Sequence, residues 1–179
     1  MLVPLSWLKN YVPITDTPED LAHKLTMAGT EVGGVALRFG LFYGPGSSHS
    51  KMLIDSARRH VGFVAGSPRA FQPAIHLADA AGATVAALAV PSGVYLVTDD
   101  EPLTRRDFAR AVGAAVGVVR LVRSPGSAAR LGGRFTQSLT RSHRTSNGRF
   151  VAASGWSPKF PSAREGWRAT VDTMLSRNA

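Results

Sequence analysis

The sequence predicts an α/β fold, in which short buried strands alternate with amphipathic helices. Residues 37–46 open with apolar β-forming side chains and close with Gly-Pro-Gly, which is typical of a buried strand that ends in a turn. Capped helix patterns follow at 47–60 and 103–115. Strand patterns at 61–65 and 93–98 lie between these helices. Alternation of this kind is the signature of the α/β class.

Composition places the chain among ordinary soluble domains. Its 179 residues suit one domain, with or without an appendage, and an apolar content of 44% is enough for a core. The sequence contains no cysteine, which excludes disulfides and thiolate metal sites and agrees with a cytoplasmic location. We expect no signal peptide and no membrane span, because no apolar run reaches the roughly 18 residues that a span requires.

The net charge of +9 is spread unevenly along the chain. Residues 1–34 hold two Lys and four Asp or Glu, for a charge of −2, whereas residues 35–179 hold 19 basic and eight acidic residues, for a charge of +11. No acidic residue occurs between Asp107 and Glu165, where ten Arg or Lys fall. Such a field attracts phosphates, nucleic acid or an acidic surface, and the alternative is an ordinary solvated basic face.

The pattern of residues 1–34 predicts two small helical units. Ser6 is placed to cap a short first helix. Thr17-Pro18-Glu19-Asp20 is a strong start for the second, with a cap, a proline at the first helical position and acids in the first turn. An apolar stripe follows and Gly29 is placed to end the helix; the stripe consists of Leu21, Ala22, Leu25 and Ala28.

The middle of the chain continues the alternation. Ser47 and Ser48 can cap the helix that ends near the basic residues 58–60. A strand at 74–76 leads into an Ala-rich helix that ends near Ala89. His76 is interpreted as a packed histidine at a strand end rather than a ligand or base, and Asp79 as a first-turn acid on the helix dipole rather than a catalytic carboxylate.

Three further patterns complete the C-terminal part. Thr104 and Asp107 predict a capping box, ahead of a helix with the apolar side Phe108, Ala111, Val112 and Ala115. Residues 117–150 have weak periodicity and are rich in Gly, Ser, Thr and Arg. Gly155 and Pro158 predict a turn around Trp156. A second capping box, Ser162 with Glu165, begins a last helix with the stripe Trp167, Val171, Met174 and Leu175.

Two segments carry a resemblance to a known family. Arg-Phe-Gly-Leu-Phe-Tyr-Gly-Pro-Gly at 38–46 and Gly-Trp-Ser-Pro-Lys-Phe-Pro-Ser-Ala-Arg-Glu-Gly at 155–166 resemble motifs of the NAD-dependent epimerase/dehydratase family, the extended short-chain dehydrogenase/reductases. The resemblance covers residues 35–176. It implies the C-terminal part of such an enzyme: an incomplete Rossmann-like sheet with the small α/β substrate domain, preceded here by a short helical head.

The resemblance also implies site residues. Leu41, Phe42 and Tyr43 match positions that border the nicotinamide and the substrate, although strand-end packing is the alternative for Phe42 and Tyr43. The segment 140–147 resembles the family's Arg-x-x-Ser-Asn segment, which makes Arg141, Arg144 and Asn147 candidates for substrate binding. The parent family uses NAD(P), and the implied ligand of this half is a phosphorylated or nucleotide-linked small molecule.

Residues 1–34 resemble a different family. Val-Pro-Leu-Ser-Trp-Leu-Lys at 3–9 and Leu-Thr-Met-Ala-Gly-Thr-Glu-Val at 25–32 look like the N-terminus of the phenylalanine–tRNA ligase beta subunit. That segment carries none of the aminoacylation chemistry. The join near 33–35 has no typical Gly/Ser linker. We therefore divide the chain into a head, 1–34, and an epimerase-like part, 35–179, which together look like a chimera.

The chemistry of a complete dehydrogenase is missing from the sequence. No Gly-rich turn of the form G-x-G-x-x-G or G-x-x-G-x-x-G occurs to hold a pyrophosphate. The family's Tyr-x-x-x-Lys pair is also missing, because the residues four positions after the three tyrosines are Thr15, Ser47 and Asp99. We therefore expect no catalytic residue, no metal site and no NAD(P) binding by this chain.

Other functions stay open at this level. The basic stretch 120–149 could contact nucleic acid, although Phe135 is the only aromatic residue before Phe150 that could stack on bases. The head alone could indicate a fragment related to phenylalanine–tRNA ligase. Strand 36–43, parted from most of its sheet, predicts self-association through an exposed edge and marginal stability.

Overall fold

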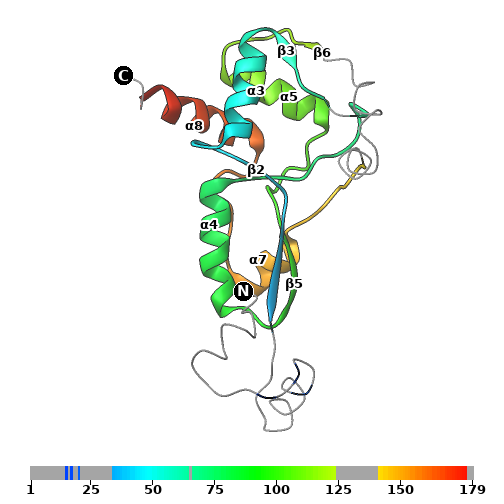
Figure 1. The fold of residues 1–179 in the computed structure, drawn as a ribbon, viewed down its shortest axis with the longest axis vertical. Coiled ribbons are helices and arrows are strands. Elements are labelled where there is room, and N and C mark those ends of the chain that lie inside the picture. Colours follow the sequence, from blue (N-terminus) through cyan, green and yellow to red (C-terminus); the bar gives the residue numbers. More distant parts are fainter. Residues whose placement is uncertain are drawn as a thin grey trace.

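The computed structural model describes most of the predicted epimerase-like part of the chain. The described residues are Thr15, Thr17 and Asp20, and the ranges 34–64, 66–123 and 141–176. Helices and strands gather into two bodies joined by extended segments (Figure 1). One body holds a two-stranded sheet with two helices, and the other holds three helices. The predicted helix at Ser6 and the apolar stripe at 21–28 lie outside the described residues.

The first body is built on a parallel strand pair. Strand β1 (Val35–Phe39) pairs with β5 (Gly93–Val97), in a register that places Val35 opposite Gly93 and Phe39 opposite Val97. Helix α4 (Leu77–Ala86), extended by a 3-10 turn (Ala87–Ala89), and helix α7 (Gly148–Ser154) cover one face. We call the apolar cluster between them the sheet core; its buried members are Ile75, Ala80, Ala83, Tyr95, Val97 and Phe150.

The second body is a cluster of three helices. Helices α3 (Ser48–Arg58), α5 (Arg105–Ala115) and α8 (Ala163–Ser176) pack around the side chain of Tyr43. Two short parallel strands, β3 (Val61–Gly62) and β6 (Val122–Arg123), lie beside them. We call this cluster the helix core; its largest buried side chains are Tyr43, Trp167, Phe108, Leu53, Ile54 and Leu103. Of the predicted α8 stripe, Leu175 stays exposed.

Gly40 divides the predicted strand at 36–43 into two. Strand β2 (Leu41–Tyr43) does not continue the β1–β5 pairing but pairs with β4 (Ala74–His76), which contributes Ala74 to the helix core and Ile75 to the sheet core. The change falls between two hydrogen bonds: Gly40 N–H donates to the carbonyl of Val97 over 3.1 Å, and Leu41 N–H donates to Pro73 over 2.8 Å. A Cβ at position 40 would lie 2.8 Å from the backbone of Ala74, so this crossing requires glycine.

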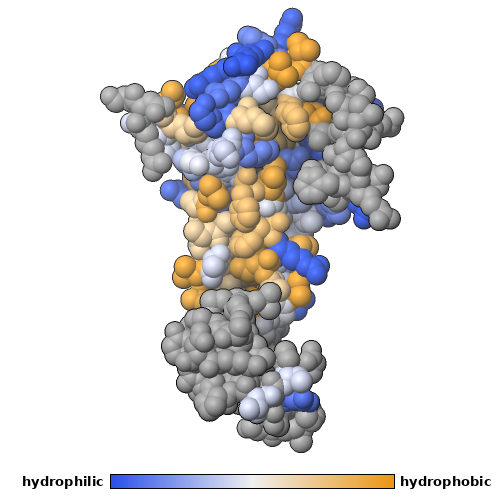
Figure 2. Space-filling view, viewed as in Figure 1, coloured by the Kyte–Doolittle hydropathy of each residue, from blue (hydrophilic) through white to orange (hydrophobic). Residues whose placement is uncertain are grey.

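The predicted α/β class is confirmed, and the sheet is small in the described ranges. There it consists of three separate pairs of parallel strands. Side chains on the second face of the β1–β5 pair stay in solvent: Leu96 is 39% exposed and Val94 is 43% exposed. Apolar residues gather over the middle of the visible surface, around β1, β2 and α4 (Figure 2). Parallel strands are usually buried on both faces, whereas the described helices bury only one face of the β1–β5 pair.

Most predicted helix starts are confirmed by their hydrogen bonds. The hydroxyl of Thr17 accepts from the backbone N–H of Asp20 over 3.2 Å, and Thr104 accepts from Asp107 over the same distance. Ser47 caps α3 through the N–H of Ser50. Each contact spans three residues, which is why the local pattern was sufficient to predict it.

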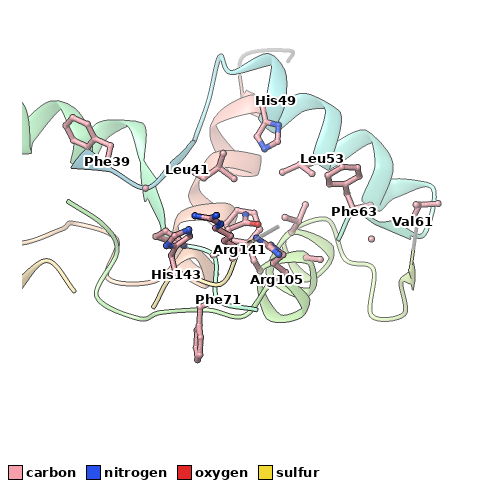
Figure 3. A pocket seen from close by; sticks show the side chains of 18 residues that line it. Phe39, Leu41, His49, Leu53, Val61, Phe63, Phe71, Arg105, Arg141 and His143 are labelled. Atoms are coloured by element: carbon pink, nitrogen blue, oxygen red, sulfur yellow. Dashed lines mark hydrogen bonds between the residues drawn. The ribbon is translucent and has the colours of Figure 1, made fainter. Parts of the chain in front are cut away.

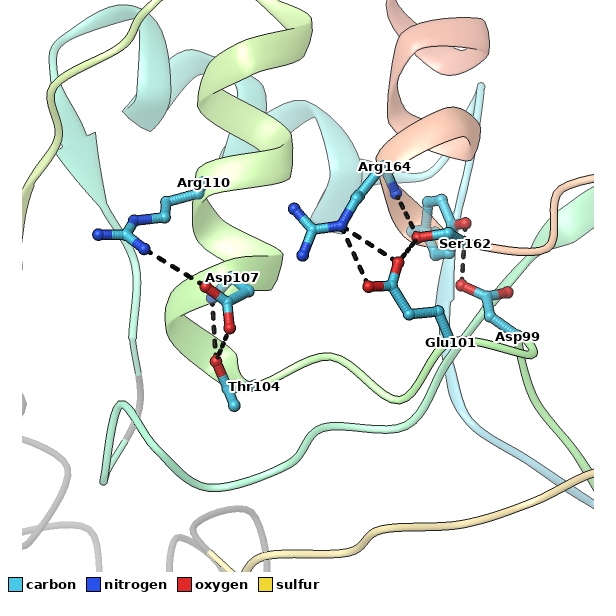
Figure 4. Close-up of polar contacts among 8 residues, drawn as sticks. Asp99, Glu101, Thr104, Asp107, Arg110, Ser162 and Arg164 are labelled. Carbon is cyan, nitrogen blue, oxygen red and sulfur yellow. Dashed lines mark hydrogen bonds and ion pairs between the residues drawn. The ribbon is translucent and has the colours of Figure 1, made fainter.

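The capping box predicted at the start of α8 was right for Ser162 but wrong for its partner, Glu165. Ser162 caps α8 by accepting from the N–H of Arg164, but its hydroxyl donates to the carboxylate of Glu101 (Figure 4). Glu101 also accepts from the guanidinium of Arg164 over 3.1 Å. These contacts, led by the hydroxyl of Ser162, lower the pKa of Glu101. Glu165 belongs to α8 itself and cannot link this helix to another segment. Glu101 follows β5, so its contacts with Ser162 and Arg164 link α8 to that part of the chain.

Candidate functional site

An apolar hollow in the described part of the chain lies where the two bodies meet. It has a volume of about 420 Å³ and lies between helices α3 and α5 and the segments around Gly40 and Gln72. Figure 3 shows His49 and Leu53 extending from α3 on one side, with Arg105, Arg141 and His143 on the other. Pockets of this size and apolar character hold small organic ligands.

The walls of the pocket are mainly aromatic and aliphatic. Four phenylalanines line it: Phe39, Phe63, Phe71 and Phe108. Phe63 is 50% exposed, whereas Phe108 is buried in the helix core. The pocket therefore has one aromatic wall held rigidly by the core and one that faces solvent.

The charged groups at the pocket are cationic. The described lining contains five polar side chains and no acidic or hydroxyl side chain; the five are His49, Gln72, Arg105, Arg141 and His143. Each offers hydrogen-bond donors, and both arginines carry full positive charge. The arrangement can bind an anion beside an apolar group.

Arg105 is positioned by the start of α5. It occupies the first helical position after the Thr104 cap, and its N–H donates to the carbonyl of Ala70 over 2.9 Å. Its Nη2 donates to the carbonyl of Arg141 over 2.9 Å. The residue is almost completely buried, and burial lowers the pKa of its guanidinium. A buried guanidinium beside a cavity interacts strongly with an anion, because little water screens it.

The segment that carries Arg141 is held against Phe71. The hydroxyl of Ser142 accepts from Phe71 N–H over 3.0 Å, and His143 N–H donates to the Phe71 carbonyl over 3.2 Å. The guanidinium of Arg144 lies 5.5 Å from the centre of the Phe71 ring, in a cation–π contact. These contacts hold Arg141 and His143 at the pocket, and Arg144 against the ring of a residue that lines it.

His49 contributes a polar atom with no partner of its own. It lies in the first turn of α3, and its Nε2 is buried without a hydrogen-bond partner among the described residues. Buried polar atoms are nearly always satisfied in folded proteins. Because His49 lines the pocket, a bound ligand or water could supply the missing partner.

The three residues predicted to border a nicotinamide occupy different environments. Leu41 lines the pocket. Phe42 is 43% exposed and packs against Phe39, with ring centres 5.2 Å apart. Tyr43 is 0% exposed and stacks on Trp167, with ring centres 5.0 Å apart. Tyr43 is therefore a core residue, and of the three only Leu41 faces the pocket.

The three residues predicted to bind substrate are likewise separated. Arg141 lines the pocket and Arg144 contacts it through Phe71. Asn147 is buried elsewhere: its Nδ2 donates to the carbonyl of Thr98 over 2.9 Å and to the carboxylate of Asp100 over 2.7 Å. Those bonds fasten the start of α7 to the end of β5, which is a structural role.

His76 and Asp79 also have structural roles, and that interpretation of His76 is confirmed. His76 is buried, caps α4 through Ala78 N–H over 3.2 Å and packs on Phe160, with ring centres 4.4 Å apart. Burial lowers its pKa. Asp79 does more than the predicted first-turn acid, because its carboxylate accepts from the N–H groups of Lys159 and Phe160, over 2.7 and 3.1 Å.

A buried polar pair joins the end of β2 to the segment that follows β5. The hydroxyl of Tyr43 donates to Asp99 over 3.1 Å. Burial raises the pKa of Asp99 to about 8, despite the opposing effect of that hydrogen bond, and burial together with the charge of Asp99 raises the pKa of Tyr43. Both side chains are enclosed by the cores, so the pair supports the fold rather than reacting with a ligand.

Most residues of the pocket belong to no motif in the sequence. His49, Phe63, Phe71, Gln72, Arg105 and His143 were not predicted as site residues. Their spacing carries no motif, because they come from five separate stretches of chain that only folding brings together. The described ranges contain no cluster of three His, Asp or Glu side chains that could hold a metal ion, and they contain no helix long and apolar enough to cross a membrane.

Comparison with known proteins agrees with this architecture. No family model matches the chain. A 3-diazoavenalumate denitrifying reductase from a Streptomyces species is 31% identical over 147 residues, which cover 78% of this chain and 48% of the reductase. The human epimerase family protein SDR39U1, solved with NADPH, superposes with a TM-score of 0.71 at 24% identity, over 86% of this chain and 54% of that one. UDP-glucose 4-epimerase from Thermus thermophilus, solved with NAD, gives 0.55 at 25% identity, over 87% and 51%.

These similarities define the fold. The described chain has the Rossmann-like α/β fold of NAD-dependent epimerases and short-chain dehydrogenases, and it spans about half the length of the proteins it matches. A separate, short similarity joins 32 residues, 18% of the chain, to the phenylalanine–tRNA ligase beta subunit of Dehalococcoides mccartyi, at 56% identity and over 4% of that subunit.

Proposed function

We propose that residues 35–176 form the substrate-binding portion of an NAD(P)-dependent epimerase- or reductase-type fold, and that the pocket binds a small organic anion. The observation that carries the proposal is the pairing of an apolar cavity with the guanidinium groups of Arg105 and Arg141. Its relatives act on small organic molecules according to their names, a diazo compound in one case and UDP-glucose in another. A phosphate, a nucleotide or a carboxylate would each supply the negative charge that complements the two guanidinium groups.

We further propose that this chain does not catalyse hydride transfer by itself. The structural neighbours were solved with NADPH or NAD, which makes NAD(P) the cofactor of the parent fold. The 179 residues contain neither a Gly-rich pyrophosphate turn nor a Tyr-x-x-x-Lys pair. Leu41 would lie at the cofactor side in a complete fold. The residues present therefore suit binding and orientation of a substrate, and the proton and hydride steps need groups from elsewhere.

Two measurements test the proposal. Titration calorimetry with NADH and NADPH should show no binding, and the purified chain should not oxidise either cofactor in the presence of candidate substrates. A thermal-shift panel of phosphates, nucleotides and carboxylates should contain anions that raise the melting temperature.

The matched variants are Arg141→Gln and Arg106→Gln. Arg141 lines the pocket, whereas Arg106 lies on the outer side of α5 beside Asp107, 3.8 Å from its carboxylate. The anion-induced shift should disappear in the first variant and persist in the second. A panel in which no anion shifts the melting temperature, or cofactor turnover by the purified chain, would refute the proposal.

A further inference from the structure

The hydrogen-bonding groups of the pocket restrict the class of anion it can take. Apart from the histidine nitrogens, the described lining offers one side-chain acceptor, the amide oxygen of Gln72, against the donors of Arg105 and Arg141. A sugar carries several hydroxyls, each of which donates as well as accepts. Hydroxyls enclosed by Phe39, Phe63 and other apolar walls would lose water without finding side-chain acceptors, and each hydroxyl that no backbone carbonyl reaches would cost about 1–3 kcal/mol. The lining therefore disfavours a glycosyl group.

The planar guanidinium groups of the pocket suit a planar anion. A guanidinium presents a flat fork of donors that matches a carboxylate in a two-point contact. The guanidinium of Arg105 donates to the backbone carbonyl of Arg141, so it lies against the segment that carries the second arginine of the pocket. Figure 3 shows both arginines on the side opposite His49. The pocket is thus cationic at one end and apolar toward the other.

The apolar part suits an aromatic ring. Phe63 and Phe108 come from different stretches of chain and both line the cavity, with Phe39 and Phe71 nearby. Aromatic rings prefer stacked or edge-to-face contacts with other rings, which add about 0.5–1.5 kcal/mol to the burial of their area. The half-exposed ring of Phe63 would bury its free face against such a ligand.

We propose that the pocket binds a compact aromatic carboxylate, with the carboxylate on Arg105 and Arg141, the ring among the phenylalanines, and His49 at the far end. This inference rests on the proposed function, because it specifies the ligand of the same pocket. It differs from the phosphorylated or nucleotide-linked ligand expected from the sequence. A polar substituent on the ring would meet the buried Nε2 of His49, which has no partner among the described residues.

The test compares three probes on the full chain by titration calorimetry: 2-naphthoate, its uncharged counterpart 2-naphthalenemethanol, and UDP-glucose. We expect 2-naphthoate to bind at least tenfold more tightly than either of the others. Arg141→Gln should remove the advantage of the carboxylate over the alcohol, and Arg106→Gln should keep it. Arg141 is exposed, so its replacement should leave the melting temperature of the free protein unchanged.

A second measurement locates the ligand even if a variant folds poorly. In the wild-type protein, 2-naphthoate should shift the imidazole NMR signals of His49 and His143, which line the pocket. The signals of His60, an exposed residue whose Nδ1 lies 3.4 Å from the carbonyl of Arg120, should stay in place. Shifts confined to His60 would overturn the proposed site.

The outcomes separate the two proposals. Tighter binding of UDP-glucose than of 2-naphthoate, lost in Arg141→Gln, would overturn the aromatic carboxylate and leave the anion-binding function in place. Equal binding of the alcohol and the carboxylate would overturn both, since the guanidinium groups would then do nothing. Failure of all three probes to bind, together with an empty thermal-shift panel, would also refute both.

Discussion

Tyr43 and Asp99 join the two bodies of the molecule through one buried hydrogen bond. Tyr43 ends β2 and lies in the helix core, whereas Asp99 follows β5, which belongs to the sheet core. The 3.1 Å contact between Oη and Oδ2 spans 56 positions of sequence. Asp99 N–H in turn donates to the carbonyl of Ala74 over 2.8 Å, which fixes this junction to β4. The two hydrogen bonds link β2, β4 and the end of β5.

Removing the hydroxyl of Tyr43 should weaken the fold. Tyr43→Phe leaves Oδ2 of Asp99 buried without its donor, and Oδ1 already has no partner among the described residues. We expect the free energy of unfolding to fall by about 1–3 kcal/mol, measured by urea denaturation. Tyr95→Phe is the matched control, because its hydroxyl donates to a carbonyl, that of Pro91, at a partly exposed position. An equal loss in both variants would contradict a special role for the Tyr43–Asp99 pair.

The same pair predicts how stability depends on pH. The folded pKa of Asp99, about 8, lies above its ordinary value of 3.8, so the folded protein keeps a proton that the unfolded chain releases. The stabilising effect is complete below the ordinary pKa and is lost as the pH rises toward 8. The free energy of unfolding should therefore decrease by up to about 1.4 kcal/mol per pH unit across this window.

The measurement is best made between about pH 6.5 and 8, the upper part of the window in which Asp99 loses its effect. His76 has a pKa lowered from 6.5 and acts in the opposite sense at lower pH. The other ionisable groups near the pair are Asp79, Asp100 and Glu165, and the charges of the first two act on Asp99 in the same direction as burial. Asp99→Asn should flatten the pH profile. A profile that is equally steep in this variant would show that Asp99 is not the titrating group.

Two helical glycines should respond oppositely to alanine. A Cβ on Gly166 in α8 would overlap the hydroxyl oxygen of Tyr43 and lie 2.8 Å from its ring carbons, so Gly166→Ala must displace a buried ring and should cost about 1–3 kcal/mol. A Cβ on Gly82 in α4 would meet Nε1 of Trp156 at 3.4 Å, an ordinary contact. Gly82→Ala should therefore stabilise the protein by up to about 1 kcal/mol. The melting temperatures of both variants test this. If Gly166→Ala melts no lower than the wild-type protein, Gly166 is not closely packed against Tyr43.

The uncovered face of the β1–β5 pair should drive self-association. Leu96 on this face is opposite Arg38, and β1 has one strand partner in the described part of the chain. We expect sedimentation velocity to show oligomers that Leu96→Lys reduces, because a charge on that face opposes its burial. Val119→Lys is the control, since Val119 is 93% exposed and lies beyond the end of α5. A monomeric wild-type protein at micromolar concentration would argue against this interface.

Some features could be predicted because their partners are close in sequence. The caps at Thr17, Ser47 and Thr104 each join residues three positions apart, so the residue types alone specify the hydrogen bond. The turn at 44–46 and the left-handed C-cap at Gly155, with φ of 67°, depend on residues that tolerate those dihedral angles. Trp156, which packs against the sheet core, follows from the same local turn.

Other features became visible only in three dimensions. The strand at 36–43 is continuous by its pattern but changes partner at Gly40, because Pro73 approaches there. Ser162 binds Glu101, 61 positions away, rather than Glu165. The pocket itself combines Arg105 from a helix start with Arg141 from an irregular segment, and neither position stands out by spacing.

The amino-acid sequence by itself determined the α/β class, the sites where the helices with a side-chain cap of Ser or Thr begin, and the lack of a Gly-rich turn and a Tyr-x-x-x-Lys pair; helix α7, which has no such cap, was not predicted from the weakly periodic stretch 117–150. Those properties depend on contacts within a few residues or on the presence of a motif. The tertiary structure alone decided that Tyr43 is a core residue, that Asp99 is buried beside it, and that two arginines share a cavity. Burial and long-range pairing depend on which distant segments meet, and the pattern along one strand or helix does not contain that information.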